Sequence, residues 1–202
     1  MRRIIVGMSG ATGVIYGIRM LKALQACGVE THLVVTQSAV KNLLIETDYT
    51  AADLESLAHT VHDVDDIGAA IASGSYSVEG MVVVPCSIKT LSAIANSFNY
   101  NLLVRAADVT MKERRRLVLV VRETPLHEGH LELMTKVTRM GGVIMPPVPA
   151  FYHRPKTIDD IIGQSVGKVL DLFGIDAKLF ARWGNENGMK LVNTKRERGK
   201  KS

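Results

Sequence analysis

Strand-like and helix-like segments alternate along most of this 202-residue chain, and the alternation restricts the folds that it can adopt. Runs of β-branched and aliphatic residues predict strands at 3–7, 31–36, 80–85, 117–122 and 142–146, with a weaker one at 60–63. Amphipathic periodicity predicts helices at 14–27, 38–46, 65–73, 90–95, 101–115, 127–139 and 157–173. This order predicts an α/β fold, a Rossmann-like (flavodoxin-like) doubly wound parallel sheet in a single domain.

The positive charge of the chain is concentrated near its end. The formal net charge is +5, and residues 195–202 hold five basic side chains against Glu197, so the remainder is close to neutral. We therefore expect one domain over residues 1–185 and a basic, flexible tail over residues 186–202. A near-neutral body argues against a protein that binds nucleic acid along a basic face.

A glycine-rich turn follows the first predicted strand. Gly7, Gly10 and Gly13 allow the backbone to bend and to approach a ligand closely, and Ser9 and Thr12 add hydroxyl groups. A helix that begins after such a turn directs unpaired N–H groups at one point, which suits a phosphate. The same residues also fit a tight strand-to-helix connection that binds nothing, so the turn alone leaves both interpretations open.

The turn does not match two well-known nucleotide loops. No Lys follows Gly13, as a P-loop requires, and the glycines lack the G-x-G-x-x-G spacing of dinucleotide folds. The second strand ends at Thr36, where NAD-binding folds place an acidic residue for the ribose hydroxyls. The turn is therefore better suited to a mononucleotide phosphate.

Polar side chains follow most of the predicted strands. Residues 87–90 come after the strand at 80–85, Arg122 ends a strand that we expect to be buried, and Tyr152 lies beyond the last strand. A buried cation needs an anionic partner or a path to solvent. Because doubly wound sheets bind ligands at the carboxyl ends of their strands, these residues predict a ligand site on that edge.

Neither a disulfide framework nor a metal site is indicated. The chain has two cysteines, and Cys86 has no neighbouring base that would make it a nucleophile, so we expect it to be structural. The His-x-x-His pairs at 59–62 and 127–130 lack further ligands. No apolar stretch approaches the roughly 20 residues of a membrane span. Reduced cysteines and no membrane span predict a cytoplasmic protein.

Eight short motifs then occur in a characteristic order. They are GMSGATG at 7–13, ETD at 46–48, PCSIKTLS at 85–92, RAADV at 105–109, KERR at 112–115, RETPLH at 122–127, PPVPAFYHRP at 146–155 and ARW at 181–183. In this combination the chain closely resembles the UbiX/Pad flavin prenyltransferases, from residue 3 to about residue 184. Only the basic tail lies outside the resemblance.

The resemblance implies an FMN-binding Rossmann-like fold that assembles into homododecamers. Members of the family join the dimethylallyl group of dimethylallyl phosphate to N5 and C6 of reduced FMN, without a metal, and release phosphate. The prenylated FMN then serves as cofactor for a UbiD-type decarboxylase. The sequence leaves open which decarboxylation the product serves, the oligomer number and the length of the prenyl donor.

The resemblance also assigns the residues that bind FMN. They are Gly10, Ala11, Thr12, Thr36, Ser87, Ile88, Lys89, Thr90 and Arg122. Thr12 and Thr36 stand where the family usually has serine, so each keeps the hydroxyl and adds a methyl group. For Ser87 and Thr90 the alternative is simple helix capping.

Six further residues receive roles by the same resemblance. Tyr152 and Lys168 match the residues that bind dimethylallyl phosphate, although most members have Arg at position 168 and Lys lacks its bidentate fork. Glu46 is expected to handle protons at the flavin. Arg105 and Lys112, seven residues apart on one helix face, are expected to be active-site cations, and Trp183 to offer its π face to a dimethylallyl cation. The alternatives are ordinary surface cations and a packing tryptophan.

Three other functions are compatible with parts of the pattern. A flavin-dependent cysteine decarboxylase of the same fold would need a His after the first helix region and an Asn-containing loop, whereas this chain has PPVPAF at 146–151. A non-catalytic FMN carrier would not need Arg105, Lys112, Arg122 and Lys168 beyond the flavin phosphate. A nucleic-acid-binding module would depend on the basic tail.

Overall fold

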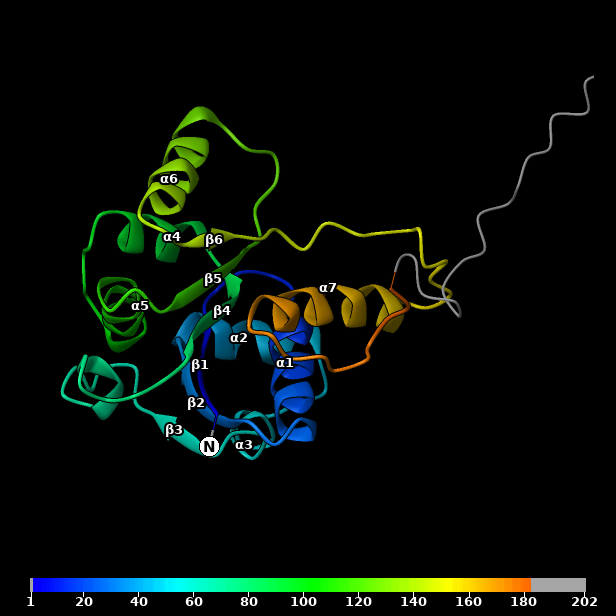
Figure 1. The fold of residues 1–202 in the computed structure, drawn as a ribbon, viewed down its shortest axis with the longest axis horizontal. Coiled ribbons are helices and arrows are strands. Elements are labelled where there is room, and N and C mark those ends of the chain that lie inside the picture. Colours follow the sequence, from blue (N-terminus) through cyan, green and yellow to red (C-terminus); the bar gives the residue numbers. More distant parts are fainter. Residues whose placement is uncertain (1, 183–202) are drawn as a thin grey trace, which may run out of the picture.

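Residues 2–182, which the computed structural model describes, form a six-stranded parallel sheet with helices on both faces (Figure 1). The strands are β1 (Arg3–Met8), β2 (Glu30–Val35), β3 (Thr60–His62), β4 (Gly80–Cys86), β5 (Arg116–Val121) and β6 (Val143–Ile144). The helices are α1 (Val14–Ala26), α2 (Gln37–Glu46), α3 (Ala51–Glu55), α4 (Ile88–Ala95), α5 (Leu102–Lys112), α6 (Glu128–Arg139) and α7 (Ile158–Leu172). The predicted α/β class is confirmed, while the predicted tail at 186–202 lies outside the described residues.

The order of the strands places a switch point at the centre of the sheet. The order is β3-β2-β1-β4-β5-β6, so the chain builds outward in one direction from β1 and in the other from β4. The connections that follow β1 and β4 therefore diverge, and a crevice forms at their carboxyl ends. The sheet is doubly wound, as the alternation of segments predicts.

The two faces of the sheet are packed by different helices. Ile4 on β1 belongs to a core with Leu21 of α1 and Val166 of α7, whereas the next residue, Ile5, belongs to a core with Leu103 of α5. Both faces of the central strands are therefore apolar, which explains their continuous aliphatic runs. Figure 1 shows α1 and α7 on one side of the sheet and α4, α5 and α6 on the other. Within residues 2–182, no helix is long and apolar enough to cross a membrane.

The prediction of a helix over residues 65–73 is wrong. Turns occupy this region, apart from a short 3-10 helix at Ala70–Ala72. The carboxylates of Asp63 and Asp66 each accept a backbone N–H from the residue two positions ahead, at 3.0 Å. Such local bonds favour turns over helix, and the periodicity of the apolar residues did not reveal them.

Other boundaries also differ from the prediction. Helix α5 ends at Lys112 rather than at 115, because Arg114 adopts a left-handed conformation with φ of 57°. Strand β6 covers Val143–Ile144 instead of 142–146, and two prolines follow at 146 and 147, where they cannot donate to a strand ladder. The short α3 was not predicted.

A buried polar cluster joins β2 to the edge strand β3. His32 is 3% exposed, and its Nδ1 lies 2.9 Å from Nε2 of His62. Its Nε2 lies 3.1 Å from a Glu30 carboxylate oxygen and 3.1 Å from the Tyr76 hydroxyl. The neighbouring Arg3 guanidinium, more than His32, lowers the pKa of Glu30 to about 2. Burial lowers the pKa of His32 and of His62, because the charged imidazolium would lose its hydration.

We expect this cluster to make the fold less stable in mild acid. An unfolded histidine takes up a proton near pH 6.5, while the folded His32 and His62 take theirs up at lower pH. The unfolded chain therefore binds more protons below about pH 6.5, and the free energy of unfolding falls as the pH drops through that value. Urea unfolding midpoints at about pH 7.5 and pH 5.5 measure the change.

Two variants assign the pH dependence to the cluster. His32→Gln cannot titrate in this range, so its midpoint should vary less with pH than that of the parent, whatever its absolute stability. His127→Gln removes an exposed histidine and should keep the parent's pH dependence. A full pH dependence in His32→Gln would contradict the assignment.

Candidate functional site

A cavity of about 490 Å³ lies at the carboxyl edge of the sheet, where the chain leaves β1, β2, β4 and β5. We call it the switch-point cavity. Its lining residues are Gly10, Thr36, Gln37, Ser38, Val64, Asp65, Ser87, Ile88, Lys89, Thr90, Tyr100, Asn101 and Glu123. The fold thus brings together Gly10, Thr36 and residues 87–90, which the sequence predicted to share a site.

Three helices begin at the switch-point cavity. Thr36, Ser87 and Asn101 are the N-cap residues of α2, α4 and α5, and their side chains accept N–H bonds at 3.2, 3.3 and 3.0 Å. Ser87 therefore does act as a helix cap, the alternative that the sequence left open for it. In α2 and α4 the caps leave other N–H groups of the first turn free of side-chain caps, whereas in α5 the Leu102 N–H donates to the Val64 carbonyl. The positive ends of three helix dipoles meet at the cavity. The arrangement favours an anion.

The glycine-rich turn is tied to the start of α4 by one buried hydroxyl. Ser9 is 1% exposed, and its Oγ accepts the N–H of Ser87 at 2.8 Å and donates to the carbonyl of Pro85 at 3.1 Å. The next residue, Gly10, lies against Ser38, and a Cβ added to Gly10 would stand 2.3 Å from the Ser38 Cβ. Only glycine fits at position 10, because the glycine-rich turn packs against the first turn of α2.

Glu46 has a structural partner that the sequence did not reveal. It is the last residue of α2, and its Oε2 accepts the N–H groups of Gly13 at 2.8 Å and Val14 at 3.1 Å. The carboxylate thus caps α1, whose own N-cap residue Gly13 has no side chain to do so. The N–H groups that the sequence offered to a phosphate are therefore partly used within the protein.

Ala11, Thr12 and Arg122 stand beside the cavity rather than in its described lining. Ala11 is buried and Thr12 is exposed. The backbone N–H of Arg122 donates to the carbonyl of Cys86 at 3.0 Å, which fixes Arg122 at the end of β5. Within residues 2–182, no hydrogen bond or ion pair engages its guanidinium. This half-buried cation is therefore available to an anionic ligand.

The two predicted cations of α5 do not meet in one chain. Arg105 lies one turn from the start of the helix, and its Nη1 is 3.3 Å from Asp108. Lys112 ends the helix and pairs with Glu113. Seven residues of α-helix separate them by about 10 Å along the axis. Because α5 leads to the first residue of β5, Lys112 lies toward the opposite edge of the sheet.

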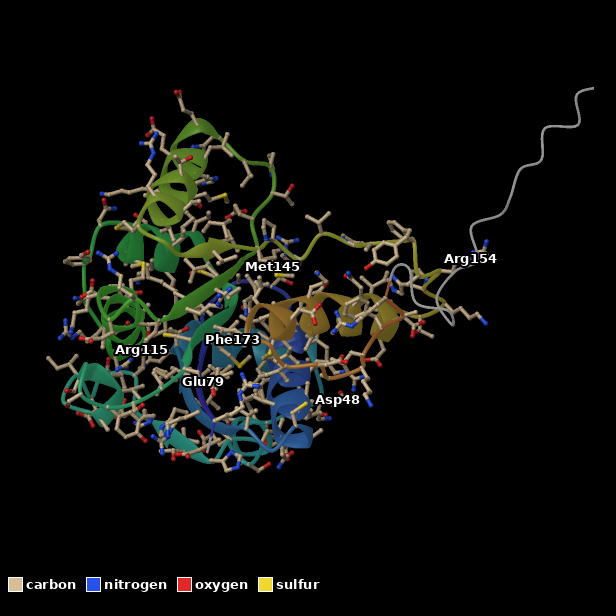
Figure 2. The ribbon with its side chains drawn as sticks, viewed as in Figure 1. Asp48, Glu79, Arg115, Met145, Arg154 and Phe173 are labelled. Carbon is tan, nitrogen blue, oxygen red and sulfur yellow. The ribbon has the colours of Figure 1, made fainter. Side chains whose placement is uncertain are left out.

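The two residues predicted to bind the donor belong to a different region. Tyr152 lies in an extended segment, residues 146–157, that projects from the end of β6 to the start of α7 (Figure 1). Figure 2 labels Met145 just before this segment and Arg154 near its outer end. The Tyr152 hydroxyl is 3.5 Å from Nε2 of Gln164, and the exposed Lys168 is 3.6 Å from Asp171. Trp183 lies outside the described residues.

Sequence reasoning missed several cavity residues. Glu123 follows Arg122 directly and could have been found by reading one residue further past the strand. Asp65, Tyr100 and Asn101 come from loops, and their position depends on bonds such as that from the Leu102 N–H to the Val64 carbonyl. No periodicity signals such bonds.

The remaining reactive side chains do not form a second centre in the described chain. Cys86 is completely buried, and burial raises the pKa of its thiol well above the usual range. It is therefore a structural cysteine, as predicted. Within residues 2–182, no three His, Cys, Asp or Glu side chains form a group that could hold a metal ion.

Comparison with known proteins places this site in a family. A doubly wound sheet with helix N-termini at its switch point is the architecture in which many α/β proteins bind nucleotides, and the family model described as Flavoprotein matches residues 1–170. Flavin prenyltransferase UbiX of Thauera aromatica is 66% identical over 91% of this chain and 95% of its own. UbiX of Escherichia coli K12 is 57% identical over 91% and 98%. The chain belongs to the flavoprotein family and, within it, to the UbiX/Pad flavin prenyltransferases.

Solved structures agree with this placement. The AnUbiX (PadA1) structure, a complex with FMN and dimethylallyl pyrophosphate, superposes with a TM-score of 0.90 at 53% identity and covers 91% of this chain and 98% of that one. A dodecameric FMN-dependent UbiX-like decarboxylase from Escherichia coli O157:H7 gives a TM-score of 0.87 at 47% identity, covering 91% and 99%. The resemblance drawn from eight motifs is confirmed.

The contact between Gly10 and Ser38 of α2 gives a direct test of the packing at the cavity. Gly10→Ala should destabilise the protein by about 1–3 kcal/mol, because the added methyl overlaps the Ser38 Cβ. Ser38→Gly in the same chain removes that Cβ and should restore much of the loss. Urea unfolding midpoints of both variants measure the effect.

Gly68→Ala is the matched control. Its added Cβ would meet only the Asp66 Oδ1 at 3.3 Å, and that carboxylate can move. This variant should unfold close to the parent. Equal midpoints for Gly10→Ala and the parent would contradict the described contact.

Proposed function

We propose that this chain binds FMN in the switch-point cavity and transfers the dimethylallyl group of dimethylallyl phosphate to N5 and C6 of reduced FMN, releasing phosphate. Bound reduced FMN supplies the electron-rich atoms that take up the prenyl group. The observation that carries the proposal is the meeting of three helix N-termini at a cavity that contains Gly10, Thr36 and Lys89.

The chemistry of the lining fits FMN. First-turn N–H groups of α2 and α4, together with the Lys89 ammonium, suit a phosphate dianion. Asp65 and Glu123, on the same lining, can accept hydrogen bonds from ribityl hydroxyls or from a ring N–H. Gly10 lets the backbone approach the ligand without a side chain in between. Ala11, Thr12 and Arg122 then complete the set from beside the cavity.

The cations of the chain account for the loss of phosphate from the donor. Arg122 and Lys168, with the Tyr152 hydroxyl, are proposed to hold the phosphate, and Arg105 and Lys112 to add positive charge as the C–O bond breaks. Positive side chains can neutralise the leaving group in this way without a metal. Trp183 is proposed to face the dimethylallyl group with its π surface.

These groups lie apart in one chain, and we propose that assembly brings them together. Tyr152 and Lys112 stand away from the switch-point cavity of their own subunit. The projecting segment 146–157 carries Val148 and Phe151, which are 71% and 69% exposed and would be covered by another copy. The dodecameric structure of the Escherichia coli O157:H7 relative supports a homododecamer with active sites at subunit contacts.

The product and the location complete the proposal. Prenylated FMN is proposed to leave for a UbiD-type decarboxylase, which uses it as cofactor. Cys27 and Cys86 are both free thiols, which suits the reducing cytoplasm. The AnUbiX structure is a complex with dimethylallyl pyrophosphate, the diphosphate of the same prenyl alcohol, so both donors belong in the test.

The test of the function is a change in the mass of the flavin. We expect anaerobic incubation of the protein with reduced FMN and dimethylallyl phosphate to raise the flavin mass by one prenyl unit and to release inorganic phosphate. A parallel reaction with dimethylallyl pyrophosphate identifies the preferred donor. An unchanged flavin mass with both donors, in protein that binds FMN, would show that the proposed reaction is wrong.

Glu46 gives the second test. Its described hydrogen bonds engage Oε2, which leaves Oε1 to take part in proton transfer at the flavin during ring closure. Glu46→Gln keeps an oxygen that can cap α1, so FMN affinity should change little. The single-turnover rate of prenylated FMN formation should fall about 100-fold or more, the usual loss of a general acid–base group.

The neighbouring carboxylate provides the control for Glu46. Asp48→Asn changes an exposed acid of the same ETD motif and should keep both the FMN affinity and the rate. A normal single-turnover rate in Glu46→Gln would show that Glu46 does not transfer a proton in the reaction. A loss of FMN affinity that accompanies a lower unfolding midpoint would instead assign Glu46 to the α1 cap alone.

A further inference from the structure

The Lys89 ammonium stands in an unusual electrostatic position. Lys89 is the second residue of α4, where the helix dipole already presents its positive end. Within residues 2–182, no carboxylate forms an ion pair with it, although Asp65 and Glu123 share the lining of the switch-point cavity. A cation placed there without a carboxylate partner adds to the positive potential instead of reducing it.

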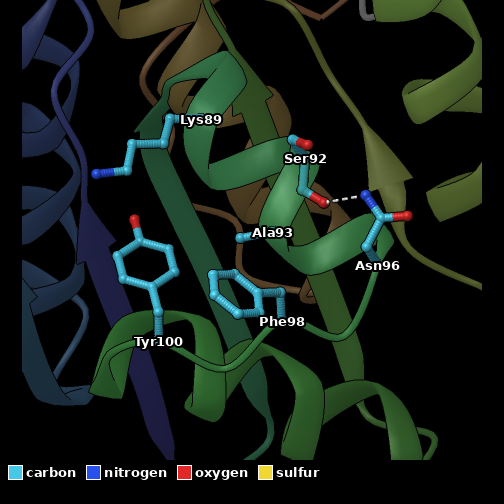
Figure 3. A pocket seen from close by; sticks show the side chains of 6 residues that line it. All are labelled: Lys89, Ser92, Ala93, Asn96, Phe98 and Tyr100. Carbon is cyan, nitrogen blue, oxygen red and sulfur yellow. Dashed lines mark hydrogen bonds between the residues drawn. The ribbon is translucent and has the colours of Figure 1, made fainter.

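The ring of Tyr100 holds this ammonium. The Lys89 Nζ lies 5.0 Å from the ring centroid, within the range of a cation–π contact. The ring of Phe98 packs beside the Tyr100 ring, and the two ring centroids are 5.8 Å apart. Figure 3 shows the Lys89 side chain reaching across from α4 toward Tyr100, with Phe98 beside it.

A defined loop places Tyr100 where it can do this. Ser97 adopts a left-handed conformation with φ of 52°, and the N–H of Phe98 returns to the carbonyl of Ala93 at 2.9 Å. The N–H of Tyr100 then donates to the carbonyl of Phe98 at 2.9 Å. Asn101, the next residue, caps α5. The ring is therefore positioned by backbone bonds on both sides.

Lys89 and Tyr100 also form the boundary between two hollows. Both line the switch-point cavity, and both line a neighbouring groove of about 700 Å³ with Ala93, Asn96 and Phe98 (Figure 3). A flexible lysine at such a boundary could point into either hollow. The aromatic ring restricts that choice.

We propose that Tyr100 is a positioning residue for flavin binding, because its ring fixes the Lys89 ammonium where it meets the phosphate of FMN. The proposal rests on the proposed function as far as FMN is the ligand. The phosphate is the most highly charged part of FMN, and the ammonium together with the α4 N-terminus forms a positive site that can receive it. Tyr100 acts through Lys89 and needs no contact with the flavin ring.

The test compares two ligands that differ only by the phosphate. Dissociation constants of FMN and riboflavin are measured by flavin fluorescence for the parent, Tyr100→Leu and Tyr100→Phe. Tyr100→Leu should weaken FMN binding about two- to fivefold, the range of an exposed cation–π contact, and leave riboflavin binding unchanged. Tyr100→Phe keeps the ring face and should bind both ligands as the parent does.

A double variant shows whether the effect passes through the ammonium. In Lys89→Met, the Tyr100→Leu change should have no further effect on FMN binding, since the group that the ring holds is gone. Equal losses for FMN and riboflavin in Tyr100→Leu would overturn the proposal and make Tyr100 a packing residue of the flavin ring. An unchanged FMN affinity, or additive losses in the double variant, would overturn it too. A parent protein that fails to bind FMN would contradict the proposed function instead.

Discussion

The parallel pairing of β1 with β4 is the constraint on which the rest of the site depends. Their register runs from Ile4 opposite Gly80 to Gly7 opposite Val83, so the two strands end side by side while their connections leave for opposite faces. The Ser9 hydroxyl joins the two ends below the cavity. That bond holds the glycine-rich turn and the start of α4 in one place, and the contact of Gly10 with Ser38 brings the start of α2 to the same turn.

The alternation of segments predicted the class of the fold because a sheet covered on both faces leaves a strong local signal. Strand β4 is buried along its whole length, and its sequence, GMVVVPC, has no polar side chain apart from the cysteine thiol. The predicted edge of the sheet followed from the same logic, since parallel strands end together. Thr36 and residues 87–90 could therefore be placed near one another before their contacts were known. Their individual roles rested on the resemblance to a family, because hydroxyls at helix starts also serve as caps.

What the sequence could not predict depends on contacts between distant segments. A spacing of seven residues correctly put Arg105 and Lys112 on one helix, but it could not tell that α5 runs away from the cavity. Glu46 and the N–H of Gly13 are 33 residues apart, and only the packing of α2 beside α1 brings them to 2.8 Å. Tyr100 depends on a loop whose course is set by the left-handed Ser97. The helix expected over 65–73 is absent for a local reason instead, because the Asp63 and Asp66 carboxylates accept N–H groups two residues ahead.

The double attachment of α2 has a mechanical consequence. One end of this helix begins at Thr36 on the cavity, and the other ends at Glu46, whose carboxylate grips the start of α1. A ten-residue α-helix is about 15 Å long and hardly changes its length. The helix therefore lies along the glycine-rich turn, with Ser38 against Gly10 near one end and Glu46 bonded to Gly13 at the other. Moving α2 would disturb the glycine-rich turn at both Gly10 and Gly13, so the seating of this one helix sets the shape of the turn at the cavity.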